Sequence, residues 1–348
     1  MPASAETAGL PKVDLSGFHA SGHDRAVFLA DLRCILHDHG FFYLSGHGVP
    51  SSLIADVLHA SKRFFALPHQ EKLAIDMANS PHFRGYTPPG GEYTRGARDW
   101  REQIDINTEA EAFDITPDTP PWKRLIGPNQ WPASLPELKP VLLKYQAEAT
   151  RVAIEVLKAI AVALGQDETA FQDVYTPLPN QLLKIIRYPG RDIAESSQGV
   201  GPHKDGGLVT VLLQDTAAGL RVQNEAGDWL DAPPIPGTFV INTGELLELA
   251  TDGYLAAAAF SRDQVGASPP RQHFRLIPPP VRNASMIAGQ ERIGDLAPFP
   301  NPRPCVVRIF EKAVLEAFLG QRSLGSHHAR QQTHAGIDYR HRGDFPAR

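Results

Sequence analysis

Cysteine is scarce in this chain, because only Cys34 and Cys305 occur among its 348 residues. Two cysteines so far apart exclude a disulfide framework and a cysteine-rich zinc cluster. They are typical of a protein in a reducing compartment, so we expect a cytoplasmic location.

Long apolar runs are also missing, since no stretch reaches the roughly 18 consecutive apolar residues of a membrane-spanning helix. The first residues, MPASAETAGLPKVDL, lack the charged and apolar regions of a secretory signal peptide. We therefore expect no membrane partner.

Positive charge is nowhere concentrated. The 34 Lys and Arg residues are outnumbered by 39 Asp and Glu residues, which gives a formal net charge of −5. Without a basic block, the chain lacks the electrostatic surface of a nucleic-acid-binding protein. The hydrophobic content of 42% is that of an ordinary globular protein, and we expect a small molecule as its partner.

The hydrophobic pattern differs between the two parts of the chain. Residues 138–164 carry apolar side chains at helical spacing and end at Gly165, which predicts a long helix. From about residue 181, short β-rich segments such as GLVTVLLQD and GTFVIN favour a jelly roll or barrel. We predict an α+β fold with a mostly helical region over residues 1–165 and a β-core over residues 166–348, without a linker between them.

The segment GPHKDGG, residues 201–207, places His203 and Asp205 two positions apart beside a predicted strand. Alternate residues of a strand point to the same face, so both side chains can reach one ion. An imidazole and a carboxylate are two of the three ligands in the facial triad of non-haem Fe(II) oxygenases. The pair alone is weak evidence, because a strand-end histidine hydrogen-bonded to a turn aspartate has the same sequence.

Three longer segments carry a resemblance to a known family: GFFYLSGHGVP at residues 40–50, the stretch at residues 63–106, and residues 182–255, which contain GPHKDGG. Together they resemble the isopenicillin N synthase-like branch of the 2-oxoglutarate- and Fe(II)-dependent dioxygenases. The resemblance implies a double-stranded β-helix (jelly-roll) core and a C-terminal helix near residues 310–330.

The same resemblance implies an oxidoreductase that uses Fe(II), 2-oxoglutarate as co-substrate and O₂. His203 and Asp205 would be two metal ligands. Tyr188 would face the co-substrate or substrate pocket, although a packed sheet tyrosine is an equal alternative. Arg275 would bind the distal carboxylate of 2-oxoglutarate through two hydrogen bonds, the alternative being a surface arginine.

The third iron ligand of that family, a histidine, is not evident in this chain. Counting forward from Leu255 places Phe260 at the ligand position, whereas counting back from SPP and FRLIP places Gln264 there. His273 is the nearest histidine and could bind the metal only with a shifted register. Either the chain has diverged, or a shifted reading frame alters residues 256–300.

We therefore predict oxidation of a small molecule by hydroxylation, desaturation or cyclisation. Side chains that select the substrate are expected in residues 84–101 and 256–280. Two alternatives remain open: an oxidase of the isopenicillin N synthase type that does not use 2-oxoglutarate, and a catalytically impaired family member that binds a ligand or an interaction partner.

Overall fold

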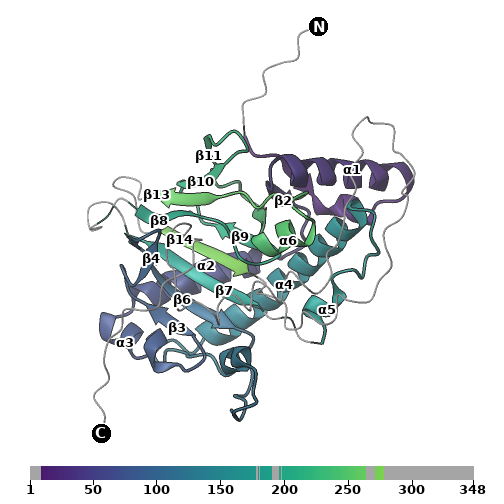
Figure 1. Ribbon diagram of the computed structural model, residues 1–348. Helices are drawn as coiled ribbons and strands as arrows, with labels where there is room; N and C mark the ends of the chain where they lie inside the picture. The colour runs from purple at the N-terminus through teal and green to yellow at the C-terminus, as the bar shows by residue number, and fades with distance from the viewer. Residues whose placement is uncertain are drawn as a thin grey trace, which may run out of the picture.

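The computed structural model describes residues 9–177, 179, 181–189, 196, 198–263 and 271–277. Most of the described strands form two sheets (Figure 1). The large sheet has the strand order β1-β2-β12-β9-β14-β7-β6-β3, and the small sheet has the order β11-β10-β13-β8. Two sheets with helices from the N-terminal region confirm the predicted α+β class with a double-stranded β-helix core.

The strands of the large sheet, in sheet order, are β1 (Lys12–Asp14), β2 (Phe41–Ser45), β12 (Phe239–Thr243), β9 (Val209–Gln214), β14 (Arg271–Ile277), β7 (Leu182–Tyr188), β6 (Glu102–Asn107) and β3 (Gly85–Thr87). Those of the small sheet are β11 (Trp229–Asp231), β10 (Leu220–Gln223), β13 (Phe260–Asp263) and β8 (Gln198–His203). A separate hairpin joins β4 (Glu92–Thr94) and β5 (Ala97–Asp99).

The α-helices are α1 (Gly22–Asp38), α2 (Ser51–Ala66), α3 (His69–Leu73), α4 (Leu138–Ala163), α5 (Gln172–Tyr175) and α6 (Glu245–Ala250). Short 3₁₀ helices cover Leu15–His19, Met77–Asn79 and Pro121–Leu125.

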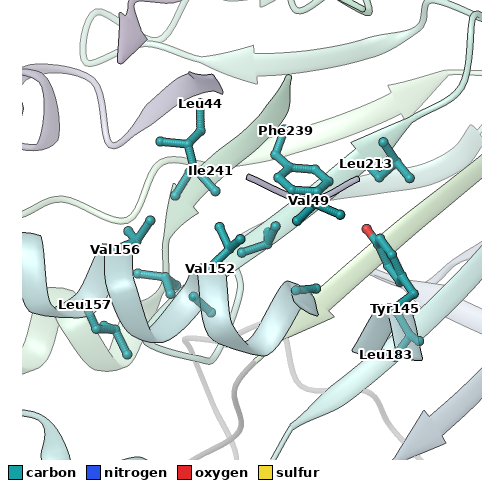
Figure 2. Packing of buried hydrophobic residues seen from close by; sticks show 14 of the residues in the cluster. Leu44, Val49, Tyr145, Val152, Val156, Leu157, Leu183, Leu213, Phe239 and Ile241 are labelled. Carbon is teal, nitrogen blue, oxygen red and sulfur yellow. The ribbon is translucent and has the colours of Figure 1, made fainter. Parts of the chain in front are cut away.

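Helix α4 packs its apolar face on the large sheet and confirms the long helix predicted from periodicity. Figure 2 shows Val152 and Val156 of this helix facing Ile241 of β12. These side chains are buried, and each contributes about 1.5–3 kcal/mol relative to an exposed position. Burial of this face therefore fixes the helix on the sheet.

Strand β2 belongs to the N-terminal region but lies inside the core. Phe42 and Leu44 join the cluster next to α4, whereas Phe41 and Tyr43 pack with residues of the small sheet. This division follows from the alternation of side chains along a strand. Both faces of β2 are thus buried, which explains its unbroken apolar sequence.

The two predicted regions share the large sheet. Strand β2 pairs with β12, and β6 pairs with β7, so strands from before and after residue 165 are hydrogen-bonded together. This sharing agrees with the lack of a linker in the sequence. The division at residue 165 stays a prediction, and the C-terminal helix expected near residues 310–330 lies outside the described residues.

Candidate active site

His203 and Asp205 lie close together at the end of β8. His203 is the last residue of the strand, and Asp205 lies in the loop that follows. The Nε2 atom of His203 is 3.9 Å from Oδ1 of Asp205. The predicted proximity is therefore present, but the loop rather than strand alternation turns the carboxylate toward the imidazole.

The backbone fixes the tautomer of His203. Its Nδ1 lies 2.8 Å from the carbonyl oxygen of Gly201. A carbonyl only accepts hydrogen bonds, so Nδ1 carries a proton, and in the neutral imidazole the lone pair is on Nε2. A neutral imidazole oriented in this way is the form that binds a metal ion.

The carboxylate of Asp205 is held through its other oxygen. Oδ2 accepts a hydrogen bond of 2.5 Å from the hydroxyl of Thr210 and one of 3.2 Å from the side-chain amide of Asn242. All three side chains are buried. These two donors leave the carboxylate oriented with Oδ1 on the side of His203.

Helix α6 holds the loop that carries Asp205. The backbone N–H of Glu245 donates to the carbonyl oxygen of Asp205 at 2.7 Å. A Cβ atom added to Gly244 would lie only 2.1 Å from the carbonyl oxygen of Gly207. Only glycine fits at position 244, because any side chain would push α6 away from the loop.

Phe260 lies where a third ligand could approach. It is the cross-strand partner of His203, and the two ring centroids are 4.3 Å apart. Among the described residues, no group of three His, Cys, Asp or Glu side chains could hold a metal ion. The donor chemistry of His203 and Asp205 fits Fe(II), but the described part of the chain supplies two protein ligands rather than three.

A pocket opens between the two sheets next to this pair. Its free space, about 20 Å³, has room for about one water molecule. Tyr188 lines the pocket, and the guanidinium carbon of Arg262 lies 4.9 Å from the centre of its ring; binding of a co-substrate by Tyr188 stays a prediction. The lining residues are Arg101, Ile186, Tyr188, Val200, His203, Leu212, Leu220, Phe260 and Arg262.

Backbone pairing places two further predicted residues near this pocket. In β14, residue 275 is opposite Leu212 of β9, and residue 273 is opposite Ile186 of β7, both of which line the pocket. The side chains of Arg275 and His273 lie outside what the structure describes, as does Gln264. Their roles stay predictions.

Arg101 of the pocket wall belongs to a group of four charged side chains. Nη2 of Arg101 is 2.6 Å from Glu92, whose other oxygen is 3.5 Å from Nζ of Lys184. Lys184 also lies 3.1 Å from Asp105, its cross-strand partner. We refer to Glu92, Arg101, Asp105 and Lys184 as the charged cluster.

Neighbouring cations affect the pKa values of the two acids of the charged cluster differently. Burial raises the pKa of Glu92, but Lys184 and Arg101 outweigh that effect and lower it to about 2. Burial raises the pKa of Asp105, and the charge of Lys184 only partly offsets the effect. Glu92 is therefore the firmly ionised acid of the pair.

The sequence did not identify Arg262 as a pocket residue. It indicated Arg101 only as part of the segment of residues 84–101. Arg101 lies at the end of the 84–101 segment expected to select substrate. Arg84, at the other end, instead donates to the carbonyl oxygens of Thr108 and Leu125 and holds the loop backbone. Arg262 follows the predicted ligand position Phe260 by two residues, and only the three-dimensional structure shows that it lines the pocket.

A double-stranded β-helix with a His-x-Asp pair between its sheets defines the class of non-haem Fe(II) oxygenases. A model of the N-terminal region of the non-haem dioxygenase in morphine synthesis matches residues 10–134. The 2OG-Fe(II) oxygenase superfamily model matches residues 179–259. The chain belongs to the 2OG-Fe(II) oxygenase superfamily, whose members are oxidoreductases that use Fe(II) and 2-oxoglutarate.

Similar proteins come from fungi and plants. The 2-oxoglutarate-dependent dioxygenase frbJ of a Dothideomycetidae species is 42% identical over 70% of this chain and 66% of its own length, just under two thirds. Homoarginine-6-hydroxylase 2-ODD-C23 of Glycine max is 33% identical over 72% of this chain and 79% of its own. Neurospora crassa T7H, solved with alpha-KG and thymine, has a TM-score of 0.67 at 26% identity and covers 80% of this chain and 88% of its own.

The superfamily match ends at residue 259, one position before Phe260. The superfamily match therefore ends just before the position where the third ligand was expected. In the described residues, no helix combines the length and apolar character needed to cross a membrane. The cytoplasmic location stays a prediction.

Proposed function

We propose that this chain hydroxylates a small molecule with Fe(II), 2-oxoglutarate and O₂, and that His203 and Asp205 bind the iron. The observation that carries the proposal is the oriented pair of donor atoms, Nε2 and Oδ1, 3.9 Å apart at the pocket wall. When bound, iron and co-substrate supply the activation of O₂.

The chain's own residues orient the reactants. The Gly201 carbonyl keeps the proton on Nδ1 of His203, and Thr210 holds the carboxylate of Asp205. We assign binding of 2-oxoglutarate to Tyr188 and Arg275, because Tyr188 lines the pocket and residue 275 pairs with the pocket residue Leu212.

The free space in the described pocket holds about one water, so we propose that a side chain moves to admit the co-substrate. We propose that Arg262 moves. Its guanidinium covers the ring of Tyr188 and donates to the carbonyl oxygens of Ala217 and Ala218 at 3.2 and 3.1 Å. Hydrogen bonds to carbonyls are replaceable by stronger ones to a carboxylate.

The charged cluster supports a substrate that itself carries charge. Glu92 is ionised, and its side chain, 12% exposed, lies beside the pocket residue Arg101. Glu92 would attract a cationic group of the substrate, and Arg101 would attract a carboxylate. An amino acid carries both groups. The name of the soybean relative, a homoarginine hydroxylase, points to the same chemistry.

Turnover of 2-oxoglutarate tests the activity. The purified protein, with saturating Fe(II), ascorbate and 2-oxoglutarate, is offered homoarginine or thymine, and succinate is measured. We expect one substrate to stimulate succinate formation and His203→Ala to abolish it. The matched control is His59→Ala, an exposed histidine on α2, which should retain full turnover. Equal succinate from wild type and His203→Ala would refute the assignment.

The substrate class has its own test. Glu92→Gln should raise the KM for a cationic substrate more than it changes kcat, because the carboxylate charge would bind the substrate and takes no part in the reaction. The variant also removes a counter-charge from Arg101 and Lys184, so its folding is checked by circular dichroism. An unchanged KM would exclude Glu92 from substrate recognition.

A second candidate function follows from Phe260. A family member that keeps the fold but binds iron weakly would act as a ligand-binding protein. The aromatic residue opposite His203 favours this alternative. Binding of the substrate without any succinate formation at saturating Fe(II) would support it.

A further inference from the structure

Strand β13 borders the candidate metal site directly. It pairs with β8 on one side and β10 on the other, so it is the middle strand beside His203. Phe260 is opposite His203 on β8 and Val222 on β10. A donor at position 260 would therefore be the nearest cross-strand neighbour of His203.

The side chain of Phe260 fills this position. It is only 3% exposed, and its ring lies between those of His203, at 4.3 Å, and Phe41, at 5.6 Å. An aromatic ring offers no lone pair to a metal ion. The cross-strand position against the His203 ring is thus occupied by a side chain that cannot coordinate a metal ion.

The neighbouring residues of β13 are less well placed to face His203. Ser261 pairs with Arg221 and does not line the pocket, whereas Phe260 and Arg262 do. A register shift between Phe260 and Arg262 sets Arg262 opposite Val200, three residues before His203. Bulges of this kind re-aim side chains next to active sites. Position 260 is therefore the one on the described part of β13 that faces His203.

We infer that Phe260 occupies the place of the third protein ligand, so that Phe260→His converts a weak two-ligand site into a three-ligand site. The inference rests on the proposed iron site at His203 and Asp205. It also selects one of the two registers that the sequence left open, since Gln264 lies four positions further along the chain.

Metal affinity tests the inference without relying on turnover. Co(II), which does not react with O₂ as readily as Fe(II), is titrated into wild type and Phe260→His by calorimetry and by its visible absorption. We expect Phe260→His to bind Co(II) at least about tenfold more tightly, because a third donor replaces water. Adding His203→Ala to this variant should remove the gain.

Ser261→His is the matched control, since it adds the same imidazole one position away on the other face. It should bind Co(II) as weakly as wild type. The inference is overturned if a folded Phe260→His gains nothing, or if Arg262→His gains affinity instead.

A second variant covers the case in which the buried histidine disturbs folding. Phe260→Ala opens space that free imidazole can enter. Imidazole should then strengthen Co(II) binding by Phe260→Ala and not by wild type. If imidazole has the same effect on both proteins, position 260 is not the ligand position.

The two proposals fail in different ways. If Phe260→His binds Co(II) tightly but neither protein forms succinate, the proposed function fails and the inference stands. If wild type already binds Co(II) as tightly as Phe260→His and forms succinate, the function stands and the inference is wrong.

Discussion

Thr210→Val probes how firmly the fold holds the proposed metal ligand Asp205. The two side chains have nearly the same shape, so the change mainly removes the 2.5 Å hydrogen bond to Oδ2 of Asp205. Thr210 is fully buried, and water cannot replace the lost donor. The Asn242 amide remains as a partner at 3.2 Å. A hydrogen bond to a charged group contributes about 1.5–3 kcal/mol, and we expect a loss of this size in the free energy of unfolding.

Urea denaturation of wild type, Thr210→Val and Thr210→Ser measures this loss. Serine keeps the hydroxyl, so Thr210→Ser should lose much less than Thr210→Val. In an Asp205→Ala background the valine change should cost little, because its partner is gone. Affinity for Co(II) should fall by about 10–100-fold in Thr210→Val, as for other residues that orient a metal ligand. A loss below about 0.5 kcal/mol, or the same loss without Asp205, would refute the reasoning.

Three further predictions concern stability. Lys72→Met should lower the free energy of unfolding by about 3 kcal/mol in urea, because it leaves Glu102, 2.7 Å away and buried, without one of its cations; a change near zero would contradict this. Gly244→Ala should give little folded protein by circular dichroism, whereas Gly206→Ala, with nothing within 4 Å of the added Cβ, should fold normally. Burial lowers the pKa of His47, so the folded state favours its neutral form. Stability should therefore decline as pH falls below about 6.5, the value in the unfolded chain, and His47→Gln should show a weaker decline in urea titrations.

Local patterns in the sequence were enough for the main elements. The apolar spacing of residues 138–164 predicted α4 to within one residue at its end. The short β-rich segments after residue 181 correspond to β7, β9 and β12 of the large sheet and to β10 and β11 of the small one. Each pattern lies within one continuous segment, so it can be recognised from the sequence without a structure.

The candidate site was predictable only in part. His203 and Asp205 are neighbours in sequence, and their pattern indicated a metal site. The position of Phe260 depends on the pairing of β13 with β8, where a register shift makes counting along the chain ambiguous. Arg101 and Arg262 come to the same pocket from distant segments, and no local pattern shows such a meeting.

The place of β14 in the large sheet has a consequence for biosynthesis. This strand lies between β9 and β7, so among the described strands it alone joins the part formed by β1, β2, β12 and β9 to the part formed by β7, β6 and β3 (Figure 1). It is also the last described element along the chain. A nascent chain on the ribosome therefore exposes the unpaired edges of β9 and β7 until residues 271–277 emerge, and during that interval it needs protection from aggregation.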